Sequence, residues 1–256
     1  MDASATSRRL GLGEIIVTTL RIYRDNYLTF FVILAIYMLP EAALSAISLM
    51  LPNLEWLNYL QSLLGVLGMM LCSAAATYAA GQVYLGKTVN VGAAYRKVLD
   101  RFGSLLNAGI RVGIVLLPSL TVIGIPVTIY FLVRWSLWMC AVMLDGDRAR
   151  PSLARSSDLV KGSWWRVFGI TLVLGSVPFL APYTVNVVLV ILGQAPDLWS
   201  AITSTNPGEI AVDALAQMFI AAFTTIGQVI LYFDLRLRKE GPGGKQTASP
   251  ALAAMS

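Results

Sequence analysis

Long apolar runs alternate with short amphipathic stretches along almost the whole chain. Each apolar run holds roughly 19 to 29 residues, and about 20 helical residues cross a hydrocarbon core near 30 Å at 1.5 Å per residue. The pattern therefore predicts an all-α, polytopic membrane protein with six transmembrane helices. The predicted spans are residues 27–51, 57–85, 104–123, 126–144, the run that follows Trp164-Trp165-Arg166 and ends near Leu192, and 210–235.

Three amphipathic stretches precede alternate spans, and each carries apolar residues at helical spacing on one side. The first covers residues 10–26. In the second, residues 88–103, Asn90 is a candidate N-cap, and positions 91, 94, 95, 98, 99 and 102 form the apolar stripe. The third begins at Pro151, carries Arg155, Asp158 and Lys161 on its charged side, and leads into a Trp pair of the kind that anchors helices at membrane interfaces. We expect three interfacial helices.

Proline recurs at the same depth in three spans, which suggests a pseudo-threefold repeat. With Pro40, Pro118 and Pro178 as equivalent points, each unit reads as amphipathic helix, Pro-containing span and second span. The units cover about 10–86, 88–145 and 150–238 of a single transmembrane domain, 1–238. Three unrelated amphipathic linkers are the alternative. Residues 239–256 are rich in Gly, Pro, Ala and Ser, which predicts a disordered cytoplasmic tail.

Composition and charge placement fix the class of protein and its predicted orientation. With 57% hydrophobic and 13% charged residues, the chain is too apolar for a soluble domain. Of its 19 Lys and Arg residues, only Arg111 and Arg134 lie within predicted spans, and the rest avoid alternate links. This positive-inside pattern places both termini and all three amphipathic helices on the cytoplasmic side of the inner, or plasma, membrane. The polar start has no signal-peptide run, so we expect no cleavage.

Few residue patterns suggest chemistry. The chain has no His, its 14 acidic residues are scattered singly, and Cys72 and Cys140 lie inside apolar runs as small hydrophobes. No Walker loop, G-x-S-x-G elbow or paired-Cys motif occurs. We therefore predict no catalytic residue, cofactor or metal site. Nucleic acid is not an expected partner despite the net charge of +5, because the basic residues sit at span ends. The Asp145-Gly146-Asp147 stretch is interpreted as a turn.

Glu41, Arg111 and Arg134 are the candidate intramembrane polar residues, because charge inside hydrocarbon needs a partner or a wet cavity. They could line a polar path for an anionic lipid or solute, or form a structural ion pair. From the rise per residue, Glu41 lies about 21 Å and Arg134 about 15 Å from the cytoplasmic boundary. Arg111, at about 10 Å, can snorkel to the headgroups. We predict that Glu41 pairs with Arg134.

Three polar stretches resemble a known family. They are Gly13-Glu14-Ile15 with Arg21-Ile22-Tyr23-Arg24-Asp25-Asn26, then Leu153-Ala154-Arg155-Ser156 with Leu159-Val160-Lys161-Gly162 and Trp165-Arg166, and finally residues 231–240, LYFDLRLRKE. They resemble the six-helix bacterial membrane domain that in some proteins precedes a glycerophosphoryl diester phosphodiesterase. The resemblance implies a stand-alone membrane protein of that group. A phosphodiesterase barrel needs about 250 further residues, whereas the sequence turns to Gly-Pro-Gly-Gly after Glu240.

The sequence favours an integral membrane module without catalytic activity of its own, which contacts membrane lipids and protein partners. A transporter or lipid-translocating protein for an anionic lipid or solute is the alternative, favoured if the buried charges converge on a cavity. A membrane enzyme ranks third. The sequence alone assigns no particular ligand.

Overall fold

Every element of the described chain is helical. The computed structural model describes residues 10–50, 54–117, 124–146, 149–191, 193 and 207–241, and within them it contains no strand. This confirms the all-α class predicted from the sequence. The elements are α1 (Leu12–Met50), α2 (Glu55–Tyr84), α3 (Val91–Asp100), α4 (Phe102–Leu116), α5 (Gly124–Arg134), α6 (Trp138–Cys140), the π-helix η3 (Ala141–Asp145), α7 (Ala149–Val160), α8 (Trp164–Ile191) and α10 (Pro207–Glu240).

Four helical segments of the described residues are long and apolar enough to cross a membrane, judged by length and composition. They are Leu12–Ser45, Tyr59–Tyr84, Gly124–Asp145 and Ile220–Glu240. The sequence predicted six spans and a threefold repeat, and these four segments do not establish either. Pro40 and Pro178 lie inside α1 and α8, but Pro118 lies outside the described residues. The repeat therefore stays a prediction, as does the disordered tail, which falls almost wholly outside them.

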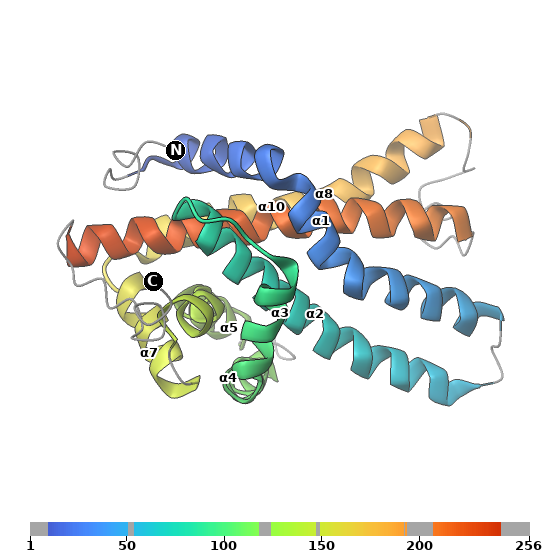
Figure 1. Ribbon diagram of the computed structural model, residues 1–256, viewed down its shortest axis with the longest axis horizontal. Helices are drawn as coiled ribbons and strands as arrows, with labels where there is room; N and C mark the ends of the chain where they lie inside the picture. Colours follow the sequence, from blue (N-terminus) through green and yellow to red (C-terminus); the bar gives the residue numbers. More distant parts are fainter. Residues whose placement is uncertain are drawn as a thin grey trace.

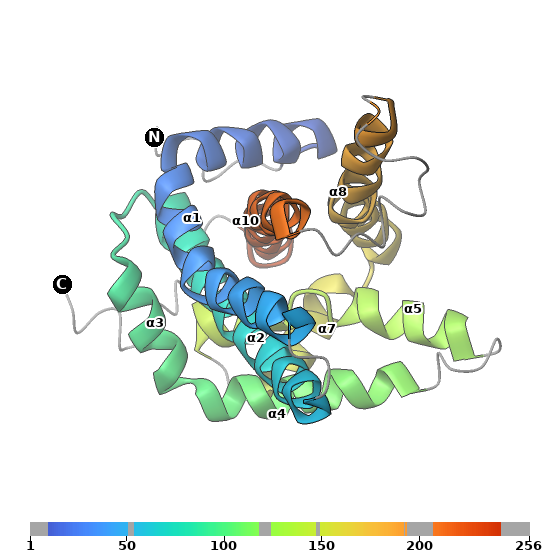
Figure 2. The same cartoon turned by 90° about the vertical axis from the view of Figure 1, so that its right-hand side faces the viewer.

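Helix α10 forms the centre of the bundle. Viewed end-on it is surrounded by α1, α2, α7 and α8 (Figure 2). Between Met218 and Leu235 most of its residues are apolar, and the buried ones include Met218, Ile226, Val229, Ile230, Leu231, Tyr232 and Leu235. A helix that is hydrophobic all round is most stable when other helices cover it. The polar residues of its last turns are therefore held against the neighbouring helices.

The predicted boundary between the first amphipathic stretch and the first span coincides with a bend in α1. Asn26 leaves helical geometry at φ −132° and ψ 20°, and its side-chain amide donates to the carbonyl of Ile22 at 3.2 Å. Figure 2 shows the first part of α1 turning sharply into the second. Pro40 lies within the second part without ending the helix.

Small residues of α2 allow close packing with the neighbouring helices. Ala75 and Ala79 are fully buried. The ring of Tyr37 lies against Gly68, where an added Cβ would stand 2.0 Å from Cε2, and its hydroxyl donates to the carbonyl of Gly65 at 2.8 Å. The α1–α2 contact depends on these glycines.

The second amphipathic stretch forms α3 much as expected. Asn90 is its N-cap, and Oδ1 accepts a hydrogen bond from the amide of Gly92 at 2.8 Å. Of the predicted apolar stripe, Ala94 and Val98 are buried, whereas Leu99 is 66% exposed. Fewer residues of this stripe are therefore buried against the rest of the protein than the apolar pattern predicted.

The fourth apolar run departs from the prediction in two ways. The helix begins two residues before the predicted span, because Gly124 and Ile125 belong with Pro126 to the first turn of α5. The span predicted over 126–144 matches the candidate span Gly124–Asp145, but it is not one regular helix: α5 ends at Arg134, a turn covers residues 135–137, and α6 and η3 follow. Side chains from α7 stabilise this break, as described below. Gly146 then takes a left-handed φ of +80°, and Asp147 lies outside the described residues.

Candidate functional site

Charged side chains from four separate parts of the chain meet at one end of the bundle. Figure 1 shows this end at the left, where the last turns of α10 lie near α7 and the start of α1. Helix α7 corresponds to the third predicted amphipathic stretch. We call the set the ion-pair network; it consists of Asp145, Arg155, Arg166, Tyr232, Asp234, Arg236, Arg238 and Glu240, together with the backbone of Leu10.

One half of the network joins η3, α7 and α10. Asp145 accepts hydrogen bonds from Nη1 of Arg236 at 2.9 Å and from Nε of Arg155 at 3.2 Å. It also accepts one from the phenol of Tyr232. Glu240 accepts from Nη2 of Arg155 and, at 3.0 Å, from Nε of Arg236. Two carboxylates thus share two guanidinium groups, and the phenol adds a further donor.

The other half joins the start of α1 to α8 and α10. Asp234 is fully buried and accepts hydrogen bonds from Nη2 of Arg166 at 3.0 Å, Nε of Arg238 at 2.8 Å, and the amide of Leu10 at 2.8 Å. The carbonyl of Leu10 accepts from the same two arginines, at 2.6 and 2.9 Å. A buried carboxylate is stable in such a position because its charge is paired and its oxygens are hydrogen-bonded.

These bonds determine what the network can do chemically. Burial lowers the pKa of Arg155, but the hydrogen bond and charge of Glu240, with the charge of Asp145, outweigh it and raise that pKa, so the guanidinium stays charged. Each network carboxylate already accepts from two or more donors. The described residues hold no group of three or more His, Cys, Asp or Glu side chains that could bind a metal. The arrangement is suited to fastening helices.

The sequence-predicted polar residues do not come together. Glu41 accepts a hydrogen bond from Nε2 of Gln61 on α2 at 3.4 Å. Arg111 donates from Nε to Asn107 at 2.8 Å, and Arg134 donates from Nη1 to the Tyr130 hydroxyl at 3.2 Å.

The predicted pair of Glu41 with Arg134 is therefore wrong. Depth along the membrane normal says nothing about which helices are neighbours in the membrane plane, and α1 packs against α2 and α10. The same residues were proposed to line a transport path, and the structure gives each its own local partner.

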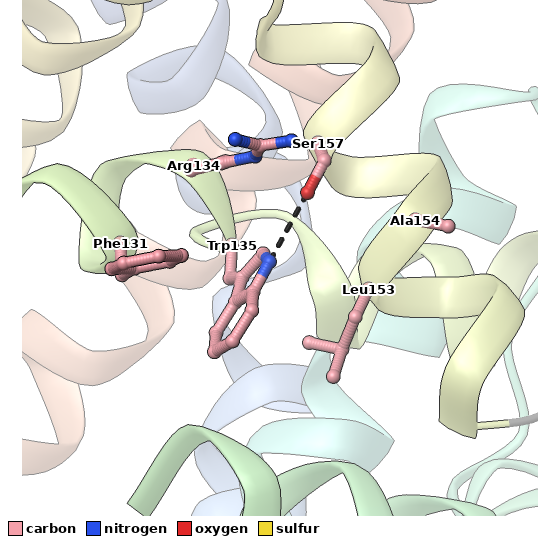
Figure 3. Close-up of a pocket in the computed structure, with 6 residues that line it drawn as sticks. All are labelled: Phe131, Arg134, Trp135, Leu153, Ala154 and Ser157. Carbon is pink, nitrogen blue, oxygen red and sulfur yellow. Dashed lines mark hydrogen bonds between the residues drawn. The ribbon is translucent and has the colours of Figure 1, made fainter. Parts of the chain in front are cut away.

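A pocket of about 310 Å³ lies between the end of α5 and α7. Figure 3 shows Trp135 at its centre, with Phe131 on one side and Leu153 and Ala154 of α7 on the other. The indole Nε1 donates to Oγ of Ser157 at 3.1 Å. Arg134 completes the lining. Sequence reasoning singled out Arg134 as a charge but could not place it beside a pocket, because the pocket exists only through the break after α5.

Aromatic rings gather beside this pocket. Trp164 stacks on Phe168 with ring centroids 5.2 Å apart and on Tyr130 at 6.1 Å, and it meets Trp165 edge-on at 4.8 Å. Trp165 is 78% exposed. Phe131 and Trp135 lie 5.2 Å apart. The Trp pair thus forms part of a larger aromatic group that joins α5 to α8.

The described chain is all-helical, with four helices long and apolar enough to span a membrane, which indicates a multi-pass membrane protein. No protein-family model, curated protein or solved structure matches the chain. The resemblance to the membrane domain associated with glycerophosphoryl diester phosphodiesterases therefore stays a prediction made from its polar motifs.

Proposed function

We propose that the protein is an integral membrane module without catalytic activity of its own, which contacts lipid and protein partners. The ion-pair network is the observation that carries this proposal. Its carboxylates and guanidinium groups are engaged with one another, and they fasten α1, α7, α8 and α10 at one end of the bundle. Removing one partner from a buried pair is costly, whereas the intact pair fixes geometry. This supports a scaffold role for the charges.

Exposed apolar surface supports the contact with lipid. Large hydrophobic side chains are exposed along the outer faces of several helices, including Leu28, Ile36 and Leu39 of α1, Tyr59, Leu63 and Val66 of α2, and Leu172 and Ile191 of α8. A water-soluble monomer rarely exposes so much contiguous apolar surface. In a membrane, the acyl chains of the lipids would cover these apolar faces and keep them out of contact with water.

The proposed topology has six spans in the inner membrane of the cell, and both termini lie on its cytoplasmic side. Helix α8 has 28 residues, so its length of about 42 Å exceeds a hydrocarbon core near 30 Å. Helix α4 has 15 described residues, and the span predicted over 104–123 extends beyond the described part of the chain. Arg155, Arg166, Arg236 and Arg238 gather at the end of the bundle that the positive-inside rule assigns to the cytoplasm.

Single-cysteine labelling in intact cells tests the topology. In a background where Cys72 and Cys140 are replaced by Ala, cysteines placed at Lys97 and Lys161 should resist an impermeant reagent. A cysteine at Glu55 should react, as should one at Asp197, which lies outside the described residues. Modification at position 97 would contradict the model. Release of the protein by alkaline carbonate, without detergent, would contradict membrane integration itself.

The transporter remains the alternative function, and a shared intramembrane cavity is what would favour it. Glu41, Arg111 and Arg134 instead contact Gln61, Asn107 and Tyr130 respectively. This dispersal is why we prefer the membrane module.

A further inference from the structure

Arg134 differs from the arginines of the nearby network in what it contacts. Arg155, Arg166, Arg236 and Arg238 each bond a carboxylate. Arg134 instead donates from Nη1 to the Tyr130 hydroxyl, and its guanidinium carbon lies 6.0 Å from the centroid of that ring. Among the described ion pairs Arg134 has no carboxylate partner, so an uncompensated positive charge lies at the wall of the pocket.

The pocket beside this charge is amphipathic. Phe131, Trp135 and Leu153 form an apolar wall, while Arg134 and Ser157 supply polar groups (Figure 3). Oγ of Ser157 accepts its hydrogen bond from Trp135, so its hydroxyl hydrogen can be donated to an anion. Guanidinium groups bind phosphate oxygens through paired N–H donors, and a hydroxyl can add a third. No carboxylate is among the lining residues, so the pocket favours a net negative ligand.

Neighbouring aromatic residues indicate the depth at which this pocket lies. Trp164 donates from Nε1 to the carbonyl of Tyr130 at 3.4 Å, and the adjacent Trp165 is largely exposed. Trp and Tyr concentrate where the hydrocarbon core meets the headgroups. The depth of about 15 Å expected for Arg134 assumed an unbroken helix, but α5 ends at Arg134, and Ser157 of the amphipathic helix α7 lines the same pocket. A ligand phosphate at Arg134 would thus be at headgroup level, and the apolar wall would meet the first carbons of an acyl chain.

We propose that the Arg134 pocket binds the phosphate of an anionic phospholipid on the cytoplasmic side of the membrane. The proposal deepens the proposed function and rests on it, since it takes the aromatic group to lie at the membrane surface. The guanidinium of Arg134 and the hydroxyl of Ser157 contact the phosphate. Phe131, Trp135 and Leu153 contact the glycerol and upper chain region.

Native mass spectrometry of the delipidated, detergent-purified full chain tests the site. Titration with phosphatidylglycerol should give binding about tenfold tighter than titration with phosphatidylcholine, because both lipids carry the phosphate but the guanidinium repels the choline cation. Arg134→Gln should bring phosphatidylglycerol to the phosphatidylcholine level. Arg111→Gln is the matched control: it removes the same charge from a residue outside the pocket, whose contact is Asn107, and should leave the preference intact.

A second variant keeps the test informative if Arg134→Gln does not fold. Ala154 lines the pocket from an exposed position, so Ala154→Trp fills the pocket without entering the core or altering charge, and it should also weaken phosphatidylglycerol binding. Equal lipid preference in Ala154→Trp and wild type, or in Arg134→Gln and Arg111→Gln, would overturn the site. Competition by glycerol 3-phosphate as strong as by the lipid would overturn the lipid as its ligand.

Failure of this inference is distinguishable from failure of the proposed function. A protein that resists carbonate extraction but shows no headgroup preference refutes the Arg134 site alone. A protein that carbonate releases from membranes refutes the membrane module, whatever its lipid titration shows.

Discussion

The Ser156 hydroxyl donates a hydrogen bond to the main-chain carbonyl of Arg134 at 3.0 Å. The same oxygen accepts from the amide of Leu137 at 3.2 Å. These two backbone groups lie on either side of the break between α5 and α6, where the regular hydrogen bonds of a helix are interrupted. Ser156 is itself buried on α7. One hydroxyl therefore satisfies two backbone groups that would otherwise be costly to bury in a nonpolar surrounding.

Ser156→Ala should destabilise the folded protein in detergent. It leaves the carbonyl of Arg134 and the amide of Leu137 without this partner, at a cost of about 1 to 3 kcal/mol. Thermal unfolding of the purified variant measures the loss. Ser176→Ala is the matched control, because Ser176 is partly exposed and its hydroxyl bonds only its own helix at Val173. Equal melting temperatures for the two variants would contradict the role of Ser156.

Asp234→Asn should be among the most damaging conservative substitutions in the chain. The carboxylate is fully buried and compensates both Arg166 and Arg238, so its loss should cost roughly 3 to 5 kcal/mol. Folded yield after extraction and gel filtration reports the effect. Asp25→Asn removes the same charge from an exposed pair with Arg24 and should change stability by about 0 to 1 kcal/mol. A tolerated Asp234→Asn would show that the network is dispensable.

Gly68→Ala should disrupt the contact between α1 and α2. The new Cβ would stand 2.0 Å from a ring carbon of Tyr37, and that ring is held by its hydrogen bond to Gly65. Overpacking of this kind costs typically about 1 to 3 kcal/mol. Gly113→Ala is the comparison, since nothing lies within 4 Å of the corresponding position and little change is expected. Thermal stability of both variants, measured in one detergent, decides whether the steric argument holds.

The folded protein should lose stability at alkaline pH, because Tyr95 then loses its proton. Its hydroxyl donates to the carbonyl of Ile33 at 2.7 Å, and burial, with a smaller contribution from Cys72, raises the pKa of Tyr95 to about 12 from its ordinary value of 10.0. Above pH 10 the unfolded chain loses this proton while the folded chain keeps it. The stabilisation is therefore complete below pH 10 and lost as pH rises through 12.

Comparison with Tyr95→Phe isolates this contribution, because Phe does not titrate. The stability advantage of the wild type should be constant up to about pH 9 and shrink between pH 10 and 12, in urea unfolding followed by circular dichroism. A pH-independent difference would show that Tyr95 titrates normally.

Local sequence signals predicted local features well. Asn90 caps α3 because its side chain can reach an amide two residues on, and that geometry is independent of the rest of the chain. The change from amphipathic to continuous apolar pattern located the bend at Asn26 for a similar reason. Gly65 and Gly68 are small enough to permit close helix packing, but the sequence alone does not show that Tyr37 occupies the space beside them.

Features that depend on tertiary contacts could not be read from the sequence. Residues 126–144 look like one uninterrupted helix, because the partner that stabilises the break, Ser156, lies on another helix. The motifs around Arg155 and Arg166 are part of the family resemblance, but the resemblance does not identify their ion-pair partners. Those partners, Glu240 and Asp234, lie 85 and 68 residues further along the chain. The membrane depth estimated from the sequence also could not place Glu41 beside Gln61, because depth does not determine which helices are neighbours in the membrane plane.

The order of synthesis adds a consequence to the central place of α10. Arg166 enters the membrane region with α8, but its carboxylate partner, Asp234, is made 68 residues later. At about 5 to 20 residues per second, the nascent chain carries this unmatched charge for roughly 3 to 14 s. Only the arrival of α10 supplies that carboxylate, so the helix that fills the middle of the bundle also completes the charge pairing of a residue made long before it.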